Sequence, residues 1–245
     1  MRVHDHIHLV GSGDDGFSLS ERSDCHVWLI DGGSSRVLID SGGGQDPERI
    51  LALIDESGVD RDSIDTVVVT HAHGDHAGGA AGLRGALGAE IMTSPEVTRI
   101  LTAGDSEAAS VPVGQRLGAY PPDYQYRACP VARELQDGDR LQVGDLDVEV
   151  IATPGHAIGH LCFLVHAGDR RDLFSGDMML FGGRLIIQNT WDCESVPYLE
   201  SVRRLGDLEI DGFFPGHLSY SVERGQRHIE IANAALDIGK FPPVL

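Results

Sequence analysis

Four potential metal ligands lie within six consecutive positions of the sequence, at His71, His73, Asp75 and His76. They directly follow residues 66–70, a run of valine and threonine that is typical of a strand buried on both faces. Imidazole and carboxylate groups suit Zn²⁺, Fe²⁺ or Mn²⁺. In a tight loop at a strand end, His71 and His73 can share one ion, while Asp75 and His76 reach a second.

Three further candidates each lie in a turn after a predicted strand. His156 ends the segment TPGH, Asp177 ends FSGD and His217 ends FPGH. Loops at strand ends are where rigid scaffolds place functional side chains. The cluster at 71–76 alone would also fit a histidine-rich surface loop. Together with these three turns, it predicts a metal centre.

The elements that must position these side chains alternate between strands and helices. In the first half, strand-like runs at 25–30 and 66–70 accompany a helix that begins at the N-cap Asp46. In the second half, the strictly alternating residues 146–151 open another set of strands, and helices follow them. This order predicts an α/β fold, an αββα sandwich of two mixed β-sheets flanked by helices. Since no linker interrupts the chain, we expect residues 1–245 to form a single domain.

The overall composition disfavours several classes of protein. The chain has 245 residues, an ordinary hydrophobic content of 41% and a formal net charge of −19. Acidic charge repels phosphate backbones, so we expect a small-molecule substrate and no nucleic-acid partner. No apolar run approaches the ~20 residues of a membrane span, and the N-terminus lacks the pattern of a signal peptide. We therefore expect a cytoplasmic protein without membrane contact, whose oligomeric state the sequence does not reveal.

Five motifs occur in one order along nearly the whole chain: LIDSG at 38–42, HAHGDH at 71–76, and then TPGH, SGD and PGH. In this combination they closely resemble the metallo-β-lactamase superfamily. The resemblance implies two divalent metal ions, with zinc expected and iron or manganese as alternatives. It assigns His71, His73 and His156 to the first ion, Asp75, His76 and His217 to the second, and Asp177 to a bridge between them.

Two more residues recur in the pattern of this family. Asp40 matches an aspartate that is near the metals but is not usually a ligand, and we interpret it as orienting a ligand through hydrogen bonds. An ordinary turn residue at a strand end is the alternative interpretation of Asp40. For His160, a structural role is expected rather than metal binding.

The resemblance implies a metal-dependent hydrolase. Hydroxide held between two ions would attack the carbonyl of an ester, thioester or lactone, with Asp75 and Asp177 as the catalytic carboxylates. Antibiotic hydrolysis is disfavoured because dizinc β-lactamases usually have cysteine in place of Asp177. Hydrolysis of acyl-homoserine lactones is disfavoured because those lactonases have tyrosine in place of Leu180, and other lactones stay open. The chain also ends soon after His217, without room for the glutathione-binding domain of glyoxalase II. The alternatives are a dioxygenase-type, iron-dependent oxidoreductase on the same fold and a phosphodiesterase.

Three segments outside the motifs carry further predictions. Residues 102–131 form a long irregular stretch, which is either a functional loop or a surface excursion without a role. Residues 178–181 are apolar and form either a pocket wall or ordinary core, and Arg184 beyond them is a candidate substrate contact. The three alternating histidines at 4–8 predict a solvent-facing stripe on an edge strand.

Overall fold

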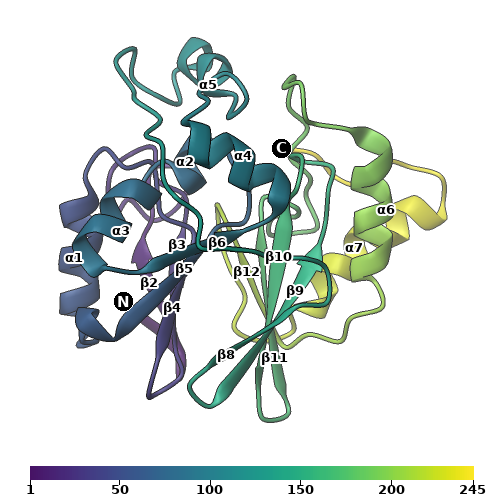
Figure 1. The fold of residues 1–245 in the computed structure, drawn as a ribbon. Helices are drawn as coiled ribbons and strands as arrows, with labels where there is room; N and C mark the ends of the chain where they lie inside the picture. Colours follow the sequence, from purple (N-terminus) through teal and green to yellow (C-terminus); the bar gives the residue numbers. More distant parts are fainter. The chain divides into compact units, whose positions relative to one another are not determined.

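The computed structural model describes residues 1–245 and contains two mixed β-sheets with associated helices (Figure 1). The chain divides into two compact units. The first comprises residues 1–135 and 143–145, and the second comprises residues 136–142 and 146–245. The predicted α/β class with two mixed sheets is therefore confirmed, whereas the grouping of residues 1–245 into a single domain stays a prediction.

The first unit is built on a seven-stranded sheet whose strands are neighbours in sequence order. The strands are β1 (Arg2–His4), β2 (Ile7–Gly11), β3 (Val27–Asp31), β4 (Arg36–Ile39), β5 (Ile64–Val68), β6 (Glu90–Thr93) and β7 (Arg133–Glu134). Pairing is antiparallel from β1 to β4 and parallel from β4 to β7. Parallel strands end at the same edge of a sheet, so the loops after β4 and β5 emerge side by side.

Six helical segments connect the strands of the first unit. They are α1 (Pro47–Glu56), the short 3₁₀ helix η1 (Arg61–Ser63), α2 (Gly74–Ala77), α3 (Ala80–Leu87), α4 (Pro95–Ala103) and α5 (Val111–Leu117). Helix α1 begins as predicted, because the Asp46 side chain accepts a hydrogen bond from the Arg49 backbone N–H at 3.2 Å. Its residues Ile50 and Ile54 are buried, and the helix packs against β2, whereas α3 packs against β5 and β6.

The second unit contains a five-stranded sheet in the order β12-β11-β10-β9-β8. Its strands are β8 (Arg140–Val143), β9 (Leu146–Ala152), β10 (Leu161–Ala167), β11 (Arg170–Gly176) and β12 (Gly212–Pro215). Strands β9, β10 and β11 pair antiparallel, whereas β11 and β12 pair parallel. Helices α6 (Ser195–Leu205) and α7 (Gln226–Asp237) contact each other, and their apolar faces join a buried core with strands β9 to β12.

The structure differs from the sequence prediction at several element boundaries. Strand β5 ends at Val68, so Thr70 already belongs to the loop that carries the histidine cluster. Asp75 and His76, which were expected in a tight loop, lie in the short helix α2. His8 is 5% exposed within β2, so the predicted solvent-facing stripe of histidines is wrong. Pairing of β2 between β1 and β3 buries this strand.

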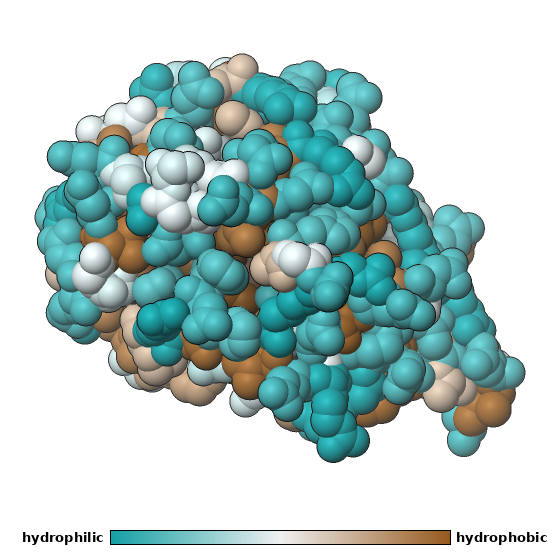
Figure 2. Space-filling view, turned by 90° about the horizontal axis from the view of Figure 1, so that it is seen from below, coloured by the Kyte–Doolittle hydropathy of each residue, from teal (hydrophilic) through white to brown (hydrophobic).

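The exposed surface is consistent with the acidic composition. The face shown in Figure 2 is largely hydrophilic, with hydrophobic residues scattered among the polar ones, as is normal for folded proteins. None of the helices is both long and apolar enough to cross a membrane. All four cysteines are free, and burial raises the pKa values of Cys25 and Cys162 to about 12.

A buried histidine connects α7 to two loops of the second unit. The Nδ1 atom of His228 accepts a hydrogen bond from the Gly182 N–H at 3.0 Å, and its Nε2 atom lies 2.8 Å from Ser221 Oγ. The neutral ring therefore carries its proton on Nε2 and donates it to Ser221. Burial, with a smaller contribution from the Arg227 cation, lowers the pKa of His228 from 6.5 to about 4.

This lowered pKa predicts a loss of stability in mild acid. Between pH 6.5 and about 4 the unfolded chain binds a proton at this site and the folded chain does not, so stability falls as the pH falls. We expect His228→Asn to reduce this slope, because the Asn side-chain oxygen can accept the Gly182 hydrogen bond without titrating. Urea unfolding at pH 7 and pH 4.5 measures both slopes, and equal slopes would contradict the prediction.

Candidate metal centre

The loop after β5 is held by one buried carboxylate, that of Asp40. Its Oδ1 atom accepts a hydrogen bond from the Thr70 N–H at 2.8 Å, and its Oδ2 atom lies 2.8 Å from His76 Nδ1. Asp40 has φ = 65°, a left-handed conformation that aspartate tolerates better than most residues. The predicted role of Asp40 in orienting a ligand candidate is therefore supported by a direct hydrogen bond, and His76 Nε2 is left for other contacts.

The three histidines of this loop lie close together. Thr70 Oγ1 lies 3.0 Å from His71 Nδ1. This contact orients the His71 ring through Nδ1, so that Nε2 lies on the opposite side of the ring. The ring centroid of His71 is 4.6 Å from that of His73 and 4.2 Å from that of His76. All three side chains are buried. The short helix α2 produces this arrangement, because the Ala77 N–H bonds the His73 carbonyl and winds the chain back on itself.

Asp75 is held from a distant part of the sequence by Tyr120. The Tyr120 hydroxyl donates a hydrogen bond to Asp75 Oδ1 at 2.6 Å and accepts one from the Asp75 N–H at 3.2 Å. The other carboxylate oxygen, Oδ2, lies 3.5 Å from His76 Nε2. Burial and the neighbouring Asp75 charge raise the pKa of Tyr120 well above its ordinary value, so the phenol stays protonated and remains a donor.

A second tyrosine supports the first. Tyr124 stacks on Tyr120 with ring centroids 4.7 Å apart, and its hydroxyl donates to the Gly74 carbonyl at 2.8 Å. A Cβ atom at Gly78 would lie 2.0 Å from this hydroxyl, so only glycine fits there. Residues 102–131 are less irregular than predicted, since they contain helix α5, and they contact the predicted site residue Asp75 through Tyr120. This contact favours the interpretation as a functional loop over a surface excursion without a role.

The ligand candidates of the second unit converge on Asp177. Asp177 Oδ2 lies 3.6 Å from His156 Nε2, and Asp177 Oδ1 lies 3.5 Å from His217 Nε2. His156 Nδ1 is 3.2 Å from the Ile186 carbonyl, which fixes the ring with Nε2 toward the carboxylate. Each oxygen of one buried carboxylate therefore faces a different imidazole.

The backbone around these residues is held by polar groups that are not themselves ligand candidates. His160 Nε2 accepts a hydrogen bond from the Asp177 N–H at 3.2 Å, which agrees with its expected structural role. The Tyr198 hydroxyl donates to the Asp177 carbonyl at 2.9 Å. Gly155 has φ = 142°, and a Cβ atom there would lie 2.2 Å from Tyr198 Cα. The turn before His156 therefore requires glycine for both conformation and space.

The spacing of these donor atoms fits metal coordination. Two ligands that bind one tetrahedral ion at ~2.0–2.1 Å are about 3.3 Å apart. The N···O separations of 3.5 Å for the His76–Asp75 pair and 3.6 Å for the His156–Asp177 pair are close to this value. A direct hydrogen bond would be shorter, at ~2.7–3.2 Å. The His/Asp clusters of both units thus suggest a metal site, while the identity of the metal is not shown.

Comparisons with known proteins agree with this geometry. The sequence profile described as "Metallo-beta-lactamase superfamily" matches residues 21–217. The chain belongs to the metallo-β-lactamase superfamily. A metallo-β-lactamase of Cronobacter sakazakii with the HARLDQ motif superposes with a TM-score of 0.74, at 18% identity, covering 98% of this chain and 96% of that chain. The predicted metallo-β-lactamase fold of two mixed sheets and helices is thereby confirmed.

Two sequence relatives show the range of names in this superfamily. The Drosophila melanogaster Beta-lactamase-like protein 2 homolog is 29% identical over 86% of this chain. The match covers only 63% of the length of that protein. A protein of Cupriavidus taiwanensis named Hydroxyacylglutathione hydrolase is 28% identical over 87% of this chain and 70% of its own length. The chain thus shares its family with a relative that is named as a hydrolase, and its His/Asp clusters are of the kind that can hold a metal ion.

The structure places the predicted site residues in two groups. His71, His73, Asp75 and His76 gather in the first unit, whereas His156, Asp177 and His217 gather in the second. Sequence reasoning missed Tyr120, which is 45 positions from its partner Asp75. A tyrosine inside a long irregular segment was the only available signal.

The two tyrosines provide a matched test of how Asp75 is positioned. Tyr120→Phe removes the hydrogen bond to the carboxylate but keeps the stacked ring, and we expect it to weaken zinc binding by about 10- to 100-fold. Tyr124→Phe removes a bond to a backbone carbonyl only, so zinc binding should be nearly unchanged. Each variant should lose about 1 kcal/mol of stability. Chelator competition measures the zinc affinities, and equal affinities in the two variants would contradict the assigned role.

Proposed function

We propose that this chain is a dinuclear metal-dependent hydrolase that attacks the carbonyl group of a small ester, thioester or lactone. The observation that carries the proposal is the geometry of Asp177, whose two oxygens each face a different imidazole nitrogen. A carboxylate that bridges two ions offers one oxygen to each of them. A single ion would need only one of the two oxygens, together with the imidazole that this oxygen faces.

The proposed ligand set combines the two groups of residues. His71, His73 and His156 would hold one ion, Asp75, His76 and His217 would hold the other, and Asp177 would bridge them. Zinc is the proposed metal because histidine and carboxylate ligands suit it, and iron and manganese accept the same donors. Asp40 and His160 support this set through hydrogen bonds to His76 and to the Asp177 backbone.

The chemistry that two such ions supply is Lewis-acid activation of water and polarisation of a carbonyl group. The chain itself contributes the orientation of the proton-carrying groups. The Tyr120 hydroxyl holds Asp75 Oδ1, and Asp75 Oδ2 faces His76 Nε2 at 3.5 Å, where it would contact the second ion. We propose that the Asp75 carboxylate accepts the proton of the attacking water and passes it to the leaving group. Tyr120 holds the carboxylate in this single orientation throughout.

A neutral carbonyl substrate suits the electrostatics of the chain better than a polyanion. The net charge of −19 repels nucleic acid and other extended polyanions. The relative named Hydroxyacylglutathione hydrolase is consistent with carbonyl chemistry. An iron-dependent oxidoreductase on the same fold is the second candidate, and the two-imidazole geometry of Asp177 favours the hydrolase over a mononuclear site.

A substrate panel with metal analysis tests the function. Protein purified without chelator should contain about two metal ions per chain and hydrolyse aryl esters, acyl thioesters or lactones at neutral pH. Chelator should abolish this turnover, and added zinc should restore it. Nitrocefin, a phosphodiester and structured RNA serve as competing substrates. A reproducible single iron per chain, or turnover of the phosphodiester with all carbonyl substrates inert, would overturn the proposal.

Two variants separate the proposed bridge from its support. Asp177→Ala removes an oxygen from each proposed ion, so activity should fall by several orders of magnitude and bound metal should fall as well. His160→Ala removes only the acceptor of the Asp177 N–H, and we expect a loss of about 10- to 100-fold. Turnover and metal content of both proteins are the readouts. Equal effects in the two variants would contradict the different roles assigned to Asp177 and His160.

A further inference from the structure

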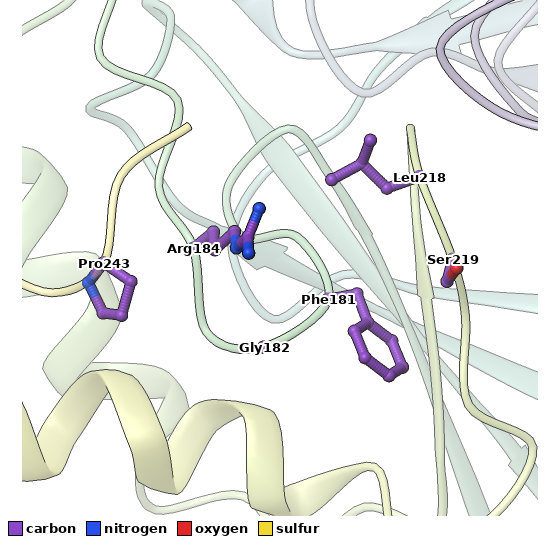
Figure 3. Close-up of a pocket in the computed structure, with 6 residues that line it drawn as sticks. All are labelled: Phe181, Gly182, Arg184, Leu218, Ser219 and Pro243. Carbon is purple, nitrogen blue, oxygen red and sulfur yellow. The ribbon is translucent and has the colours of Figure 1, made fainter.

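A cavity of about 420 Å³ lies within the second unit (Figure 3). It is lined by Phe181, Gly182, Arg184, Leu218, Ser219 and Pro243. Leu218 directly follows His217, and Phe181 follows Asp177 by four residues. This volume is within the range of ~300–1,000 Å³ that is typical of small-molecule sites. The cavity is therefore adjacent in sequence to two of the proposed ligands.

The apolar walls of this cavity are held firmly. The Phe181 ring packs against the His228 ring at a centroid distance of 4.4 Å, with the Arg227 guanidinium 5.7 Å from the Phe181 centroid. Pro243 is fixed because its carbonyl accepts a hydrogen bond from the Leu185 N–H at 2.8 Å. Met178, Met179 and Leu180 are fully buried in the core. Of the apolar segment 178–181, only Phe181 forms a pocket wall, as Figure 3 shows.

Arg184 is the one charged residue that lines the cavity. Its backbone is fixed, since its carbonyl accepts the Leu180 N–H at 2.8 Å. Its guanidinium extends into the space between Pro243 and Leu218 (Figure 3). Most arginines of this unit are paired with carboxylates, as Arg140 is with Glu149 at 2.8 Å and Arg171 is with Glu209 at 3.0 Å. Arg184 forms no ion pair and is exposed to solvent.

An unpaired arginine among apolar walls recognises a particular chemistry. Its planar group of N–H donors matches the two oxygens of a carboxylate, while Phe181 and Leu218 accommodate the carbon chain. Because this pocket has one cationic side chain and the chain has a net charge of −19, the pocket suits one anionic group rather than a polyanion. The neighbouring Ser219 adds a hydroxyl at the rim.

We propose that this pocket binds the free carboxylate of the substrate through Arg184, which makes the preferred substrates acyl esters or thioesters with a terminal carboxylate. The inference rests on the proposed hydrolase function and narrows its substrate class. Arg184 acts in binding and not in the chemical step. Its loss should therefore raise KM for carboxylate-bearing substrates and leave kcat nearly unchanged.

A matched pair of thioesters tests the assignment. N-acetylcysteamine thioesters of adipic acid and hexanoic acid have the same acyl length and differ in the terminal carboxylate. We expect the native protein to favour the adipoyl thioester through a lower KM. Arg184→Ala should raise KM for the adipoyl thioester about 10- to 100-fold and leave the hexanoyl thioester unaffected. Arg184→Lys should keep part of the preference, because it retains the charge without the planar fork.

Arg99→Ala is the control variant, since Arg99 is an exposed arginine of α4 and its removal changes the net charge by the same amount. It should behave as the native protein does. A native protein without preference for the adipoyl thioester, or an equal preference in Arg184→Ala, would overturn the proposal. Calorimetric titration with adipate provides a measurement that needs no turnover. Adipate binding that Arg184→Ala abolishes, without hydrolysis of any thioester, would support the pocket and contradict only the hydrolase function.

Discussion

The buried carboxylate of Asp40 is the interaction on which the first half of the site depends. A buried charge must be compensated, and here the donors are the Thr70 N–H and hydroxyl and the His76 ring. These partners belong to the loop after β5 and to α2, so a single side chain joins the end of β4 to both. The left-handed backbone of Asp40 costs about 1 kcal/mol, and the hydrogen bonds offset that cost.

In the second unit, the buried Asp177 is positioned in a different way from Asp40. Asp177 is held through its backbone, with its N–H on His160 and its carbonyl on the Tyr198 hydroxyl. Its carboxylate is thereby left to face His156 and His217. A residue that is held by its main chain keeps a fixed position, while its side-chain oxygens can still bind metal ions. Rigid supports of this kind reduce the reorganisation that a metal centre would otherwise require.

The sequence reveals those parts of the site that depend on local order. The turns ending in His156, Asp177 and His217 are recognisable because each follows a strand, and strand periodicity can be read directly. Tyr120 cannot be found in this way, because its bond to Asp75 depends on how a long segment folds back over the loop. The burial of His8 was not predicted for a related reason. Alternation along one strand does not say which neighbouring strands will cover it. Partners across a sheet or a loop are set by tertiary packing.

The tyrosine pair of residues 102–131 has a consequence for how relatives of this chain can diverge. Insertions are normally tolerated best in long connecting segments, so such regions change length quickly during evolution. Here the segment carries the hydroxyl that orients Asp75, and a Cβ atom at Gly78 or Gly114 would clash with Tyr124 or Tyr120. Recombination that replaces this segment must therefore import a new partner for the carboxylate. Exchanging this segment between homologues would therefore change the candidate site itself and not only a surface loop.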